Sequence, residues 1–125
     1  MISIAQGGEK EISFDKCKER LNAYNLGNVF IHKGYTHEIG EEWLKFGYGS
    51  PRFNLVFIDA GHDYGSVKRD WLIFKELLYG PSPKIAFHDT NQIYTDNVIN
   101  EYVLTDKNWK LIHHVDRIKA FQFVG

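Results

Sequence analysis

The short apolar run Leu55–Ile58 constrains the fold more than any other part of the sequence. A strand that is apolar at every position, rather than at alternate positions, is expected where helices cover both faces of a sheet. A second run of this kind, Lys84–Phe87, follows a segment whose apolar residues recur at helical spacing. We therefore predict that Leu55–Ile58 is a central strand of a mostly parallel sheet.

Short apolar strands alternate with helical patterns along the rest of the chain. Strands are predicted at 2–5, 28–32, 54–58 and 84–87, and helices are predicted to begin near Ser13, Thr36 and Ser66 and to cover about 95–104. The tail reads as two strands, 109–115 and 118–124, with Asp116 and Arg117 at the turn. This order predicts an α/β fold with helices on both faces of the sheet and a C-terminal antiparallel hairpin.

Length and charge limit the classes of function. The 125 residues fit one domain, 1–125, and 15 basic against 16 acidic residues do not predict nucleic acid as a partner. No apolar run approaches the roughly 20 residues of a membrane span. The single cysteine, Cys17, cannot form an internal disulfide, in agreement with a reducing, cytoplasmic location. A small-molecule substrate fits these properties best.

Acidic residues follow both apolar runs at the point where each predicted strand ends. Asp59 follows the first run and Asp89 the second, and ligands in open α/β sheets bind outside the carboxyl ends of the strands. With the amide of Asn91, the two carboxylates offer the oxygen ligands that Mg²⁺, Ca²⁺ or Mn²⁺ prefer, while His62 and His88 would admit a softer metal. The carboxylates could instead accept hydrogen bonds from a ribose or an amine.

A histidine lies close to these acids in the sequence. His62 is a natural general base at neutral pH, because an imidazole can accept and release a proton in this range. Simpler roles remain open, since Asp59 could cap the turn before the next helix and His62 could bond to that turn. His88 is predicted to be a half-buried histidine with its hydrogen bonds satisfied, and Asp63 and Asp70 to be surface or helix-stabilising acids.

The segment FNLVFIDAGHDYGSVKRDWLIFKELL, 53–78, followed by KIAFHDT, 84–90, resembles the class I S-adenosylmethionine-dependent methyltransferases, especially the branches that methylate hydroxyls of small molecules. The residues that carry the resemblance are Ile58, Asp59, His62, Tyr64, Val67, Asp70, Phe87, His88, Asp89 and Thr90. The chain departs from the family at Ala60-Gly61 and at 80–83. The resemblance implies a Rossmann-like domain that transfers a methyl group to a hydroxyl.

The resemblance also implies roles for individual residues. Asp59 and Asp89 would position the acceptor, directly or through Mg²⁺, with His62 as the base and Asp59 also beside the cofactor. Gly34 and Tyr35 would lie near the adenosine of S-adenosylmethionine. The pair Gly7-Gly8 would be a remnant of the glycine-rich loop that cradles the cofactor's methionine part, although such a pair is most often a simple turn.

The family's first strand and its glycine-rich loop have no clear counterpart in the sequence. The chain is therefore expected to be a methyltransferase domain truncated at the N-terminus, or one in which Ile2 to Ala5 takes a central place. A partner copy could complete the sheet, since open strand edges favour association. Two other functions remain open: a catalytically inactive, methyltransferase-like binding or assembly module, and a metal-dependent hydrolase. Against the hydrolase, the sequence lacks a recognisable metal-ligand spacing such as paired histidines one helical turn apart.

Overall fold

The structure is a computed structural model that describes residues 2–6, 11–25, 28–47 and 51–125, with side chains from residue 14 onward. Its elements are, in order, β1 (Ile2–Gln6), α1 (Glu11–Ala23), β2 (Val29–Lys33), α2 (Thr36–Phe46), β3 (Leu55–Ile58), α3 (Tyr64–Phe74), a 3-10 turn (Lys75–Leu77), β4 (Lys84–Phe87), α4 (Ile93–Val98), a π-helical turn (Ile99–Val103), β5 (Trp109–Val115) and β6 (Ile118–Phe123). The predicted alternation of strands and helices and the C-terminal hairpin are confirmed.

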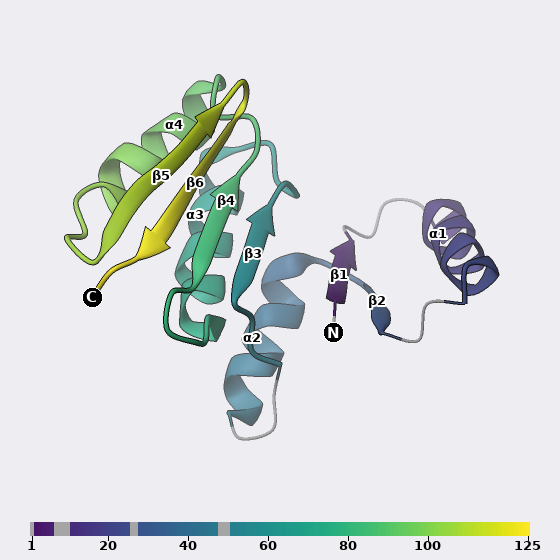
Figure 1. The fold of residues 1–125 in the computed structure, drawn as a ribbon. Coiled ribbons are helices and arrows are strands. Elements are labelled where there is room, and N and C mark those ends of the chain that lie inside the picture. The colour runs from purple at the N-terminus through teal and green to yellow at the C-terminus, as the bar shows by residue number, and fades with distance from the viewer. Residues whose placement is uncertain (1, 7–10, 26–27, 48–50) are drawn as a thin grey trace.

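The strands form two separate sheets (Figure 1). In the smaller sheet β1 pairs with β2 in parallel. The larger sheet has the order β3-β4-β6-β5, in which β3 and β4 are parallel and β6 is antiparallel to both of its neighbours. Asp116 makes the turn of the hairpin with a φ of 51°, a left-handed conformation that Asp tolerates better than most residues. The result is a mixed α/β domain of the Rossmann-like type.

The main core lies between the four-stranded sheet and helices α3 and α4, which lie behind the sheet in Figure 1. Trp71 of α3 is fully buried and packs against Phe87 of β4 and Trp109 of β5, with ring centroids 6.0 and 5.2 Å apart. Phe87 in turn meets Phe121 of β6 edge to face. These aromatic contacts fix α3 across the sheet, and so they position the loop that leads from β3 into α3.

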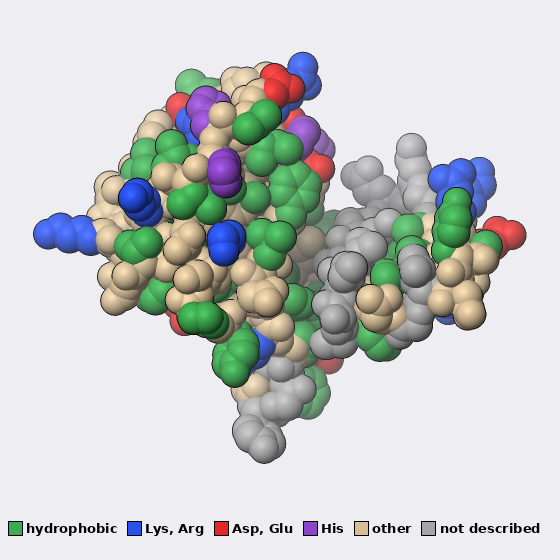
Figure 2. Space-filling view, in the orientation of Figure 1, with side chains coloured by type: hydrophobic (Ala, Val, Ile, Leu, Met, Phe, Trp, Pro, Cys, Tyr) green, Lys and Arg blue, Asp and Glu red, His purple; other side chains and the backbone are tan. Residues whose placement is uncertain are grey.

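The strand β3 differs from its prediction as a central strand with both faces covered. It is an edge strand of the larger sheet, and 59% of Leu55 and 51% of Phe57 are exposed. Residues two apart in a strand share a face, so both side chains lie on the face of the sheet opposite α3. Figure 2 views this face and shows hydrophobic side chains across the surface. The physical reason is that, among the described residues, no strand pairs with the second edge of β3 and no helix covers this face.

Two acidic residues show how α3 is held in place. Asp63, rather than the predicted Ser66, is the N-cap, and its carboxylate accepts hydrogen bonds from the backbone N–H and the hydroxyl of Ser66. These hydrogen bonds lower the pKa of Asp63. Asp70 is buried at 3% exposure, so of its two predicted roles, a surface acid or a helix-stabilising acid, the first is wrong. No helix within the described segments is long and apolar enough to cross a membrane.

Candidate functional site

The predicted convergence of Asp59 and Asp89 depends on the pairing of β3 with β4. Ile58 lies opposite Phe87 in this parallel ladder, and the backbone N–H of His88 donates to the carbonyl of Ile58 over 3.0 Å. Both strands therefore end at the same level, and the residues that follow them meet. One ligand atom from each of Asp59, His88 and Asp89 lies within 4.8 Å of the others. We call these three residues the carboxylate cluster.

His88 lies between the two acids of the cluster. Its Nδ1 is 3.2 Å from a carboxylate oxygen of Asp59 and 3.0 Å from one of Asp89. These contacts are short, but Nδ1 is buried and makes no hydrogen bond of suitable geometry, which differs from the satisfied histidine expected from the sequence. Buried polar atoms without partners are rare. A divalent cation beside Nδ1 and the two carboxylates would supply the missing partner, so the donor set fits a metal ion.

Asp89 is held in an unusual backbone conformation. Its φ is 57°, in the left-handed region that residues other than glycine rarely adopt. The conformation is fixed on both sides, because the N–H of Thr90 donates to the carbonyl of Arg117 and the N–H of Gln92 donates to that of Asp89, each over 3.0 Å. Strain of this kind concentrates at functional sites, where it aims a side chain. Here it accompanies a carboxylate that lies within the cluster.

His62 lies at the rim of the carboxylate cluster. Its side chain is 73% exposed, and its Nδ1 is 3.9 Å from a carboxylate oxygen of Asp89. The same nitrogen is 3.3 Å from the hydroxyl of Tyr94, whose ring meets the imidazole edge to face. The structure thus brings the histidine proposed as a base next to one of the two acids and leaves it accessible to a substrate.

Tyr94 was not identified from the sequence as a member of this site. It lies in the first turn of α4, and only the position of that helix at the end of β4 brings its hydroxyl to His62. Burial, with a smaller effect from the charges of Asp89 and Asp59, raises the pKa of Tyr94. The phenol therefore keeps its proton at neutral pH and can donate a hydrogen bond. No periodicity or motif in the sequence distinguishes it from the chain's other tyrosines.

Tyr64, part of the sequence motif after β3, points to a different set of partners. Its hydroxyl donates to the carboxylate of Glu101 in the π-helical turn. That hydrogen bond, followed by one with Tyr102, raises the pKa of Tyr64. A hydrogen bond with Lys68 is the largest cause that lowers the pKa of Tyr102. Tyr64 thus ties the start of α3 to the π-helical turn rather than to the carboxylate cluster.

The residues predicted to contact the adenosine lie at the end of β2. Gly34 has a φ of 147°, and a Cβ at this position would lie 3.3 Å from Cδ1 of Ile39, so the turn favours glycine. Tyr35 is exposed and stacks on His37, with ring centroids 5.8 Å apart. Both residues therefore stand at the end of a strand, and Tyr35 offers an accessible aromatic ring there. Gly7 and Gly8 lie outside the described residues, and Asn91, which is exposed two positions after Asp89, remains a predicted ligand.

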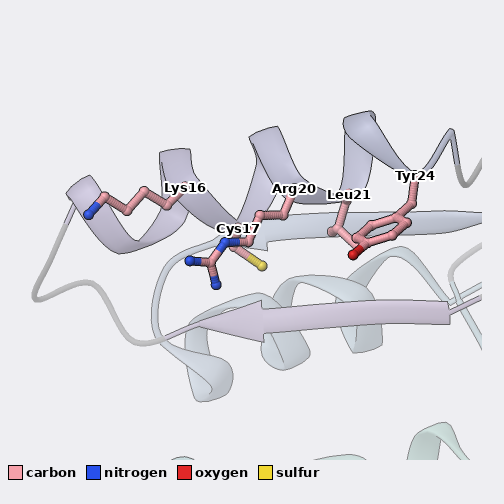
Figure 3. Close-up of a pocket in the computed structure, with 5 residues that line it drawn as sticks. All are labelled: Lys16, Cys17, Arg20, Leu21 and Tyr24. Carbon is pink, nitrogen blue, oxygen red and sulfur yellow. The ribbon is translucent and has the colours of Figure 1, made fainter.

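A pocket of about 350 Å³ lies along α1 (Figure 3), and no residue of the carboxylate cluster is among those that line it. All of its lining residues belong to this helix or its end: Lys16, Cys17, Arg20, Leu21 and Tyr24. In Figure 3 their side chains extend from one side of the helix. The pocket is an open groove beside a single helix, and among the described residues no acid or histidine lines it.

Three comparisons relate the chain to known proteins. No protein-family model matches the sequence, and no curated protein matches it. Among solved structures, a provisionally assigned caffeoyl-CoA O-methyltransferase from Staphylococcus aureus matches with a TM-score of 0.70 and 18% identity over 98% of this chain. The apo form of CalS11, a TDP-rhamnose 3'-O-methyltransferase of calicheamicin biosynthesis, matches with a TM-score of 0.63 and 12% identity over 86% of this chain.

The chain spans only part of the length of both neighbours. The chain covers 64% of the first neighbour and 50% of the second. At these identities the likeness concerns the arrangement of helices and strands, which agrees with the resemblance seen in the motifs after β3 and β4. The protein has a Rossmann-like α/β fold, which it shares with these two O-methyltransferases.

Proposed function

We propose that this protein transfers the methyl group of S-adenosylmethionine to a hydroxyl of a small molecule, with a divalent cation such as Mg²⁺ at the carboxylate cluster. The observation that carries the proposal is the meeting of Asp59, His88 and Asp89 at the carboxyl ends of two parallel strands. Its position is the one where α/β sheets bind ligands. The fold is that of two O-methyltransferases.

The residues at the end of β2 fit an adenosine. Gly34 leaves the backbone at the turn free of a Cβ, and the exposed ring of Tyr35 offers a flat apolar surface to a base. When bound, S-adenosylmethionine would supply a methyl group on a sulfonium. The leaving group would be a neutral thioether, which needs no acid catalysis. The protein's task is then to align acceptor and donor and to take up one proton.

The carboxylate cluster and His62 provide these two functions. Asp59, His88 and Asp89 would hold the cation, and a cation beside the acceptor lowers the pKa of its hydroxyl. If Nδ1 of His62 carries a proton and donates a hydrogen bond to the hydroxyl of Tyr94, Nε2 is free to accept the proton of the acceptor's hydroxyl. The exposure of His62 keeps this nitrogen within reach of an acceptor that enters from solvent.

The proposed cellular compartment rests on the cysteine content of the chain rather than on its fold. A single cysteine, half-buried on α1, requires no oxidising compartment. We therefore place the reaction in the cytoplasm.

Calorimetric titration of the full chain with S-adenosylhomocysteine, with and without Mg²⁺, tests the proposal. We expect saturable binding that the cation strengthens and that Asp59→Ala weakens by about tenfold or more, the equivalent of about 1.4 kcal/mol. Glu76→Gln, which removes an exposed carboxylate in the 3-10 turn, is the matched control and leaves binding unchanged. No heat up to millimolar ligand, from a chain that circular dichroism shows to be folded, would leave the inactive binding module as the better function.

Titration with Mn²⁺, followed by electron paramagnetic resonance, tests the cation separately. We expect binding that is lost in Asp89→Asn and kept in Glu76→Gln. Mn²⁺ binding without S-adenosylhomocysteine binding would favour the metal-dependent hydrolase. Cofactor binding without Mn²⁺ binding would mean that Asp59 and Asp89 contact the acceptor directly.

A further inference from the structure

The carboxylate cluster contains one nitrogen donor beside its oxygen donors. Nδ1 of His88 lies 3.2 Å from a carboxylate oxygen of Asp59 and 3.0 Å from one of Asp89. This nitrogen is buried and has no hydrogen-bond partner within the described part of the chain. It therefore faces the cluster, where an ion would contact it together with both acids.

The imidazole of His88 is held in this position by its surroundings. The backbone N–H of His88 donates to the carbonyl of Ile58 over 3.0 Å, which fixes the residue at the end of β4. The ring of Phe57 in β3 meets the imidazole edge to face, with ring centroids 6.1 Å apart and an interplanar angle of 84°. Contacts of this kind restrict the orientation of a ring. The nitrogen donor is thus in place before any ion binds.

The charges of the cluster favour a metal ion over a proton. Among the described residues, only histidines pair with the carboxylates of Asp59 and Asp89, and no lysine or arginine does. A proton on Nδ1 of His88 would lie in line with only one of the two acids, because a hydrogen bond prefers a nearly straight geometry. A divalent cation would contact both carboxylates and the nitrogen, and it would balance the two negative charges.

The nitrogen donor decides which metal ions fit best. Mg²⁺ and Ca²⁺ are hard cations that take oxygen ligands, whereas imidazole suits borderline cations such as Fe²⁺, Co²⁺ and Zn²⁺. We propose that Nδ1 of His88 is a metal ligand, and that it makes the carboxylate cluster select a borderline divalent cation of the Fe²⁺ to Zn²⁺ series over Mg²⁺ and Ca²⁺. Mg²⁺ would still bind through the two carboxylates, but more weakly. The inference rests on the proposed function for the presence of a cation, and it deepens that function by naming the class of cation.

Pulsed electron paramagnetic resonance of Mn²⁺ bound to the full chain tests for the nitrogen ligand. A ¹⁴N nucleus that is bound directly to Mn²⁺ modulates the electron spin echo, and ¹⁵N-labelled histidine changes this modulation. We expect the histidine signal in the wild type, its loss in His88→Asp and His88→Asn, and its retention in His62→Gln, which removes the other imidazole close to Asp89. His113→Gln, at an exposed histidine of β5, is the matched control and keeps the signal.

Competition between Co²⁺ and Mg²⁺ tests the selectivity. Divalent ions differ in affinity at any site, so the informative quantity is the ratio of the Co²⁺ and Mg²⁺ affinities, compared between variants. We expect His88→Asp, which replaces the nitrogen donor by an oxygen donor, to shift this ratio by about tenfold or more in favour of Mg²⁺. His113→Gln should leave the ratio unchanged. A ratio that is the same in His88→Asp and the wild type would overturn the inference.

The outcomes separate this inference from the proposed function. Bound Mn²⁺ without nitrogen coupling in the wild type overturns the inference and leaves the proposed function standing, and so does coupling that persists in His88→Asp. The wild-type spectrum needs no variant, so it decides the case if circular dichroism shows that both His88 variants are unfolded. A chain that binds S-adenosylhomocysteine but no Mn²⁺ overturns the inference and removes the cation from the proposed function. Nitrogen coupling in a chain that does not bind S-adenosylhomocysteine would support the inference and count against methyl transfer.

Discussion

The hydroxyl of Thr36 donates a 2.7 Å hydrogen bond to Oδ1 of Asp70 and so ties the first residue of α2 to the middle of α3. The N-cap of α2 makes no side-chain hydrogen bond of its own. Asp70 therefore helps to fix the start of this helix, which comes directly after Gly34 and Tyr35. A buried acid in the core thereby contributes to the shape of the turn proposed to contact adenosine.

The burial of Asp70 makes the stability of the protein depend on pH. Burial raises the pKa of Asp70, and the hydrogen bond from Thr36 opposes that shift only in part. A carboxyl whose pKa is higher in the folded state binds more protons there, so the free energy of unfolding falls as the pH rises from about 4 through the raised pKa. Asp70→Asn keeps a hydrogen-bond acceptor without the charge. We expect its stability relative to the wild type to increase with pH.

Urea unfolding of both proteins between pH 4 and 7 measures this effect. Asp15→Asn, which removes an exposed carboxylate on α1, should show no such trend. Thr36→Val should cost about 1–3 kcal/mol at pH 7, because it leaves a buried carboxylate without its donor. A stability difference between Asp70→Asn and the wild type that stays constant over this range would contradict the assignment.

Alanine substitutions at two glycines in helices should change the stability of the protein in opposite directions. Gly40 of α2 is buried against α3, and a Cβ there would lie 2.5 Å from Cγ2 of Ile73 and 3.2 Å from the ring of Phe74. Alanine favours a helix by about 1 kcal/mol, but overpacking costs about 1–3 kcal/mol, so Gly40→Ala should destabilise the protein. A Cβ on Gly65 of α3 would lie 3.4 Å from Oδ2 of Asp63, an ordinary contact distance, so Gly65→Ala should stabilise the protein. Thermal unfolding of both variants tests the pair, and a stabilising Gly40→Ala would mean that α2 and α3 pack less closely.

Replacing Asp89 by glycine should raise the stability of the protein and abolish its metal binding. Asp89→Gly relieves the left-handed conformation and removes one of two neighbouring carboxylates, so we expect the melting temperature without metal to rise by the equivalent of about 1 kcal/mol. The same change should abolish Mn²⁺ binding. Asp116→Gly at the hairpin turn has a similar φ of 51° and should raise the melting temperature without any effect on Mn²⁺. If Asp89→Gly bound Mn²⁺ as well as the wild type, the cation would not lie at this residue.

The aromatic core should tolerate truncation poorly. Trp71 is 1% exposed and contacts rings from β4 and β5, so Trp71→Ala should cost about 3–5 kcal/mol. Leu104→Ala, at an exposed position, should change the free energy of unfolding by less than about 0.5 kcal/mol. Chemical denaturation at neutral pH measures both. A cost near that of Leu104→Ala would show that α3 does not depend on this contact.

Local sequence patterns identified the elements of this protein well. Apolar runs predict β3 and β4, and a glycine after a helical pattern is typical of a C-cap, as at Gly47 of α2, whose N–H donates to the carbonyl of Trp43 over 3.3 Å. The N-cap of α3 was placed at Ser66 instead of Asp63, because both residue types cap helices and spacing alone does not choose between them.

The sequence by itself determined the order of strands and helices, the hairpin, and the placement of Asp59 and Asp89 directly after two apolar strands, because each depends on neighbours along the chain. The tertiary structure decided which residues meet across the chain. It buried Asp70 beside Thr36, brought Tyr94 to His62, left Nδ1 of His88 between two carboxylates, and divided the strands into two sheets. An apolar run predicts a strand, but it does not specify the neighbours of that strand or which of its faces other elements will cover. The open edge of β3 therefore became visible only when the strands were placed in space.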